Sequence, residues 1–89
     1  KIQEDIFKVY PNPAGKSENI IVEVDEKIQG QFTLSIFSHS GQKLYQIETN
    51  KKLLIIPNEI LLSDGLYYVN IKKHSMSSTK KLILKKNSR

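Results

Sequence analysis

Apolar and polar residues alternate with a period of two along most of this chain, and no long stretch shows the roughly 3.6-residue period of a helix. The clearest alternation lies in residues 31–38. Its predicted inward face consists of Phe32, Leu34 and Ile36, and its outward face includes Thr33 and Ser35. This is the period of a half-buried β-strand, so we expect the chain to fold from strands.

Turn-forming residues interrupt the alternation about every 8–12 residues. The predicted strands are residues 6–10, 19–24, 31–38, 43–49, 53–56, 66–73 and 79–85. We expect residues 74–78 to form a polar turn, and Ile60 with Leu61 or Leu62 to pack beneath the sheet. The pattern predicts an all-β, immunoglobulin-like antiparallel β-sandwich of about seven strands, without the Cys…Trp…Cys core of antibody domains.

The segment 43–49 is ambiguous, because Leu44 would face one side of the sheet and Tyr45 and Ile47 the other. We assign Tyr45 and Ile47 to the core.

The composition fits one domain that packs without disulfides. The chain has 89 residues and no cysteine, which excludes zinc-ribbon and thiol chemistry. Its net charge is +5, and no acidic residue follows Asp64, so the last quarter is basic. A basic surface favours an anionic partner, although lysines on strand edges can also serve solubility alone. Since the chain begins with Lys1 and not Met, we expect it to be part of a longer protein, and its lack of a signal peptide then says nothing about that parent protein.

No set of residues in the sequence is arranged for catalysis. The two histidines, His39 and His74, fall in predicted turns without the spacing of metal ligands. No phosphate-binding glycine loop or nucleophile elbow is present. We therefore expect no enzymatic activity, no metal and no cofactor.

Four short motifs follow one another in order. They are VYPNPA at 9–14, LSIFSHSGQK at 34–43, L-x-x-G-x-Y-x-V-x-I at 62–71 and KKLILK at 80–85. In this order and spacing they resemble the type A C-terminal sorting domain of the type IX secretion system. Two small departures are Ser38, where an acidic residue or Asn is common, and Gln42, which intervenes before the basic residue.

The resemblance implies a transport function. The parent protein would cross the inner membrane with an ordinary signal peptide, and the folded domain would be read in the periplasm by the outer-membrane translocon. A sortase-like peptidase would then cut upstream of the first strand, near or before residues 1–5. The cargo, the N-terminal part of the same chain, would be released or joined to anionic lipopolysaccharide at the cell surface. No nucleic acid partner is expected.

The resemblance also nominates residues and boundaries. Residues 1–8 would be a linker and the start of the first strand, 9–86 the sorting domain, and 87–89 a frayed tail. The signal and recognition residues would be Pro11, Asn12, Pro13, Gly41, Gly65, Tyr67, Lys80, Lys81, Leu82, Lys85 and Lys86. Of these, we expect Asn12 and the four lysines to be exposed for direct contact. If the last strand lies at a sheet edge, it could accept a strand from a receptor.

A second reading stays open from the residues alone. Tyr68 and Phe37 are predicted to face outward and could stack on sugar rings. The alternative is therefore an accessory carbohydrate-binding or spacer β-sandwich in a multidomain secreted enzyme or adhesin.

Overall fold

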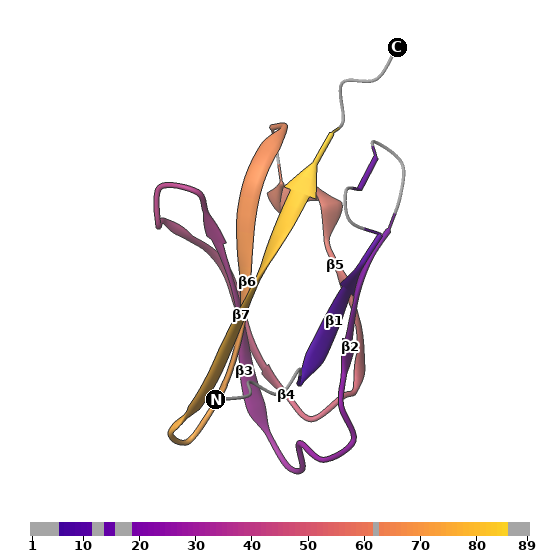
Figure 1. Cartoon of the computed structure of the whole chain (residues 1–89), viewed down its shortest axis with the longest axis vertical. Helices are drawn as coiled ribbons and strands as arrows, with labels where there is room; N and C mark the ends of the chain where they lie inside the picture. Colours follow the sequence, from indigo (N-terminus) through magenta and orange to yellow (C-terminus); the bar gives the residue numbers. More distant parts are fainter. Residues whose placement is uncertain (1–5, 12–13, 16–18, 62, 86–89) are drawn as a thin grey trace, which may run out of the picture.

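Seven strands and one short 3-10 helix make up the computed structural model, which describes residues 6–11, 14–15, 19–61 and 63–85. The elements are β1 (Phe7–Tyr10), β2 (Ile20–Val24), β3 (Phe32–Ser38), β4 (Lys43–Thr49), β5 (Leu53–Ile56), η1 (Asn58–Ile60), β6 (Gly65–Lys73) and β7 (Met76–Leu84). They form two antiparallel sheets, one of order β1-β2-β5 and one of order β4-β3-β6-β7. The sheets pack against each other as a sandwich (Figure 1), which confirms the predicted fold class.

The core lies between the inner faces of the two sheets. In the centre of the larger sheet, Leu34 pairs with Ile71 and Ile36 with Val69, and all four side chains are buried. Across from them, the smaller sheet contributes apolar side chains of β1, β2 and β5. The largest fully buried side chains are Phe7, Phe32, Ile20, Leu34, Ile36, Leu61, Ile71, Leu82, Leu84, Val22 and Val69.

The pairing of β3 with β4 shows which side chains of β4 face the core. Tyr45 pairs with Ile36 and Ile47 pairs with Leu34, so both lie on the core face, as predicted. The register slips between Ile36 and Phe37, and Leu44 falls at this irregularity and also packs against the core.

Ser35 points away from the core, as predicted, but its neighbours cover it. Ser35 is on the outer face but is buried, because its strand runs between β4 and β6 and its neighbours there are Gln46 and Asn70. A side chain as small as serine is covered by longer neighbours on both sides.

The predicted start of the last strand is wrong. β7 begins at Met76 instead of residue 79, and Met76 pairs with Lys73. The turn is therefore confined to His74 and Ser75, with His74 at a φ of 54°. Met76 is exposed, and the three residues after it are polar, so the start of β7 shows no alternation of apolar and polar residues.

The connection from β5 to β6 seals one end of the sandwich, as predicted. Leu61 is completely buried and Ile60 packs against the core. Leu62 lies outside the described residues.

Candidate functional site

The opening and closing motifs lie side by side in space. Ala14 forms an isolated parallel bridge with Leu84. Its N–H donates to the carbonyl of Ile83 at 2.9 Å, and its own carbonyl accepts from the N–H of Lys85 at 2.8 Å. The segment that follows Tyr10 thus joins the outer edge of β7. Sequence reasoning did not predict this contact, because two hydrogen bonds between residues so far apart leave no local signal.

The prolines and asparagine of the opening motif are described only in part. Pro11 is half-buried, and the Tyr10–Pro11 peptide bond is cis. Asn12 and Pro13 lie outside the described residues, as does Lys86 at the other end.

Both motif glycines have backbone conformations that favour glycine. Gly41 has a φ of 97° in the β3–β4 turn, where its N–H donates to the carbonyl of Ser38 at 2.9 Å. Gly65 has a φ of 138° at the start of β6. A Cβ at either position would have no atom within 4 Å, so the constraint comes from the backbone and not from lack of space.

Tyr67 ties the turn before β6 to the core. Its ring is buried, and its hydroxyl donates to the carbonyl of Ser63 at 2.6 Å and lies 3.3 Å from the N–H of the same residue. This arrangement is a tyrosine corner, in which a tyrosine near the start of a strand bonds to the backbone a few residues upstream. Leu82 is completely buried as well. Neither side chain offers surface to a partner, so each can contribute to a signal only through the fold.

The four motif lysines differ in their positions. Lys81 and Lys85 are exposed, as predicted. Lys80 is half-buried and pairs in register with Val69, so it points toward the inner face, and its predicted exposure is wrong. Its Nζ lies 5.9 Å from the centre of the Phe7 ring. The aliphatic stem of a lysine can pack on apolar surface while its ammonium stays near water.

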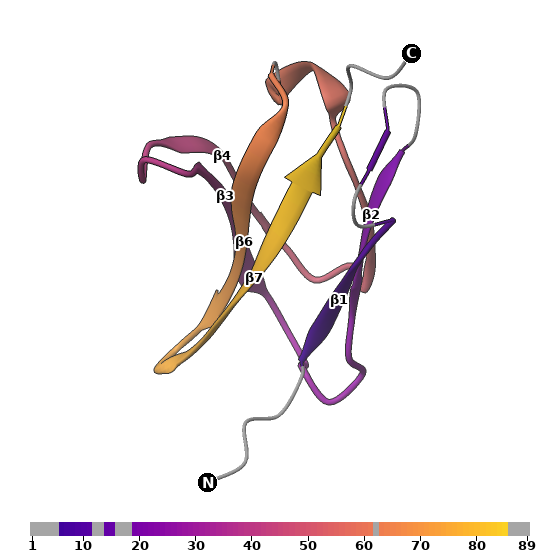
Figure 2. The same ribbon diagram turned by 45° about the horizontal axis from the view of Figure 1, so that its top comes forward.

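This contact joins the two strands that end the sheets on one side. β7 closes the larger sheet and β1 the smaller one, and both views show them next to each other at the front (Figures 1 and 2). The edge position of β7, which was conditional in the prediction, is therefore observed. Its C-terminal end already pairs with Ala14.

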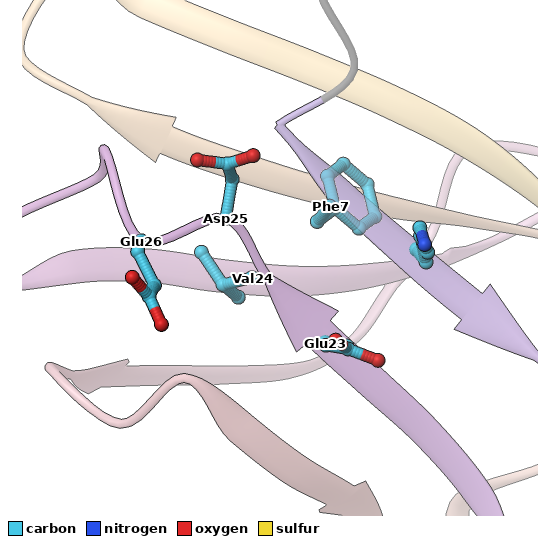
Figure 3. Close-up of a pocket in the computed structure, with 6 residues that line it drawn as sticks. Phe7, Glu23, Val24, Asp25 and Glu26 are labelled. Carbon is cyan, nitrogen blue, oxygen red and sulfur yellow. The ribbon is translucent and has the colours of Figure 1, made fainter.

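A depression of about 320 Å³ lies beside β1 and the end of β2 and contains acidic residues (Figure 3). Glu23 accepts a hydrogen bond from the Tyr10 hydroxyl at 3.0 Å, and this bond raises the pKa of Tyr10. Asp25 accepts from the backbone N–H of Lys27 at 2.8 Å. The carboxylates of Glu23, Asp25 and Glu26 point in different directions (Figure 3). Across the described residues, no three His, Cys, Asp or Glu side chains are grouped to hold a metal ion.

The outer face of the larger sheet carries the predicted aromatic pair. Phe37 and Tyr68 are opposite each other on β3 and β6 and are half-buried. Lys43 lies with its Nζ 5.9 Å from the centre of the Phe37 ring. His39 and His74 are exposed in turns, as predicted. In the part of the chain that the structure covers, no helix is long and apolar enough to cross a membrane.

Comparison with known proteins identifies the family. No curated protein matches the chain. Residues 8–85 match the secretion system C-terminal sorting domain, a span that includes all seven strands except the first residue of β1. The four motifs lie within or at the limits of this span. The chain therefore belongs to the family of type IX secretion system C-terminal sorting domains, the signals that direct proteins toward export across the outer membrane.

Proposed function

We propose that this domain carries an N-terminal cargo through the outer-membrane translocon of the type IX system and is then removed by a sortase-like peptidase. The cargo would be released or joined to anionic lipopolysaccharide at the cell surface after a periplasmic stage. The match of residues 8–85 to the family carries this proposal. In this scheme the domain is the substrate of the peptidase and does no chemistry itself.

The packing of the first strand supports a cut before Ile6. Ile6 is 4% exposed and Phe7 is 2% exposed, and the carbonyl of Ile6 accepts from the N–H of Asp25 at 2.8 Å. A cut after these residues would remove part of the core. We propose that residues 1–8 comprise the linker from the cargo and the start of the first strand, that 9–86 form the sorting domain, and that 87–89 are a tail; the burial of Ile6 and Phe7 supports keeping the first-strand start with the domain after the cut.

We propose two roles for the motif residues. Gly41, Gly65, Tyr67 and Leu82 would maintain the fold that the machinery recognises, consistent with their turn geometry and burial. The residues proposed to contact the machinery are Pro11, Asn12, Pro13, Lys80, Lys81, Lys85 and Lys86. Among those described, Lys81 and Lys85 have the exposure that direct contact requires, whereas Lys80 is half-buried with its Nζ beside the Phe7 ring.

The test is a fusion of residues 1–89 to the C-terminus of a periplasm-targeted fluorescent protein in a type IX-competent bacterium. We expect fluorescence outside the outer membrane. The mass of the exported cargo should correspond to a chain cleaved before Ile6. Export with the domain still attached would contradict the proposed removal. Retention of a folded fusion in the periplasm would contradict the proposed transport.

The outer-face aromatic pair supports a second candidate function, the binding of a polysaccharide. Phe37, Tyr68 and Lys43 combine two half-buried aromatic rings with a cation on the outer face of the larger sheet. Retention of the isolated domain on immobilised polysaccharide, lost in Tyr68→Ala, would favour this function. Equal retention of the wild-type and variant domains would refute it.

A further inference from the structure

Three of the four edge strands in the described sheets are protected against pairing with another chain. β7 is bridged by Ala14 and carries the inward-pointing Lys80. β1 lies beside the same lysine, whose Nζ is 5.9 Å from the centre of the Phe7 ring. β4 has a register irregularity and charged residues along its length. Such features are common defences of exposed strand edges.

Among the described residues, β5 has no such bridge, inward-pointing lysine or register irregularity, although it is as short as β1. Its sequence is LLII, with no charge, proline or bulge inside the strand, and it is the last strand of the β1-β2-β5 sheet. Pro57 comes only after its end. An apolar edge strand of this kind is a template for another strand.

The hydrogen-bond register shows which backbone groups of β5 face outward. The N–H of Val24 donates to the carbonyl of Lys52 at 2.8 Å, so this pair is hydrogen-bonded. In an antiparallel ladder, hydrogen-bonded and non-hydrogen-bonded pairs alternate along the strands. The backbone N–H and carbonyl groups of Leu54 and Ile56 therefore point toward β2. The N–H and carbonyl groups of Leu53 and Ile55 must then point to the open side, where the described residues provide no partner for them.

The same two residues carry the most exposed large apolar side chains that the structure describes. Leu53 is 61% exposed and Ile55 is 63% exposed. On the outer face of the sheet, Ile55 is opposite Ile21, which in turn is opposite Tyr10, itself 39% exposed. The open edge is therefore continuous with a small apolar surface, and both features suit a strand with apolar residues at alternate positions.

We propose that the β5 edge, defined by Leu53 and Ile55, binds an extended segment of a partner protein by adding it as a fourth strand to the β1-β2-β5 sheet. The segment would have apolar side chains above Leu53 and Ile55 and acidic residues near Lys51 and Lys52, which directly precede the strand. A second copy of the chain is disfavoured, because two molecules of net charge +5 repel each other.

This inference rests on the proposed function in one respect, since the partner is assigned to the export machinery that the domain meets. Binding itself can be tested without that machinery. The probe is a capped peptide of alternating valine and threonine with two glutamates at one end. We expect saturable binding and at least about tenfold slower amide hydrogen exchange at Leu53 and Ile55.

Two variants test the edge in different ways. Ile55→Pro removes an outward N–H without removing a bond of the β2–β5 ladder, as proline can do on an edge strand. Ile55→Lys keeps the N–H and places a charge on the apolar surface. Both should weaken binding of the probe by about tenfold or more. The matched control is Met76→Lys, at a 39% exposed apolar residue of β7, which should bind like the wild type.

The same three variants should be compared in the export assay after the folded state of each is verified by its thermal midpoint. We expect export to fall at least about tenfold in the two Ile55 variants and to be unchanged in Met76→Lys. Normal export and probe binding in a folded Ile55→Lys would overturn the inference and leave the proposed function standing. No export of the wild-type fusion would instead refute the proposed function. A wild-type dimer that Ile55→Lys dissociates would overturn the inference in favour of a second copy.

Discussion

The tyrosine corner provides the sharpest test of how this fold is stabilised. Tyr67→Phe keeps the buried ring and deletes only the hydroxyl, which donates to the Ser63 carbonyl at 2.6 Å and lies 3.3 Å from the Ser63 N–H. A net hydrogen bond contributes about 0.5–1.5 kcal/mol. Ser63 is exposed, so water can replace part of what is lost at the backbone. The expected decrease in the free energy of unfolding is therefore about 1–2 kcal/mol.

For a domain of this size, each 1 kcal/mol corresponds to about 4–8 °C in the thermal midpoint. The assay is urea unfolding followed by circular dichroism, with the m-value checked for constancy. The adjacent Tyr68→Phe is the matched control, because its ring lies on the outer face and its hydroxyl has no hydrogen-bond partner among the described residues. If Tyr67→Phe and Tyr68→Phe change stability equally, the corner does not stabilise the fold as argued.

Three further predictions concern other parts of the fold. Gly65→Ala should decrease the free energy of unfolding by about 1–3 kcal/mol in urea titration, because alanine is strained at a φ of 138°; an unchanged midpoint would contradict the backbone argument. Ala14 is 1% exposed, so Ala14→Leu overfills its site. The N–H of Lys85 donates to the Ala14 carbonyl, and its hydrogen exchange should become faster in this variant. Exchange as slow as in the wild type would refute this. The hydrogen bond to Glu23 raises the pKa of Tyr10. The contribution of this bond to the free energy of unfolding is therefore complete below the usual tyrosine pKa of about 10 and is lost as the pH rises through the raised pKa. An NMR titration of Tyr10 should show a lower pKa in Glu23→Gln, and an unchanged one would contradict the assignment.

The period-two pattern was sufficient to predict the strands that cross the core. In β3 and β6 each inward position meets the opposite sheet, so burial imposes alternation on the sequence. The start of β7 could not be predicted in this way, because residues beyond the core have no buried face. Its turn also depends on His74 at a positive φ, which no turn-forming glycine indicates.

Long-range contacts account for most of what the sequence did not reveal about the site. The unusual backbone geometry of Gly41 and Gly65 and the core position of Tyr67 were predicted correctly, since these residue types reflect local geometry. By contrast, the inward position of Lys80 follows from its pairing with Val69, and the open edge at β5 follows from the order of the sheet. Both require knowledge of which strands are neighbours, and neighbouring strands here are often distant in sequence.

The central claim is that this sandwich is itself sufficient to direct export. The most direct measurement is the fraction of a fluorescent cargo found outside the outer membrane when residues 1–89 are fused to it. It should be compared in one bacterium with and without the type IX translocon. We predict that export requires both the fused domain and the translocon. Equal export of the cargo without the domain, or of the fusion without the translocon, would contradict the claim.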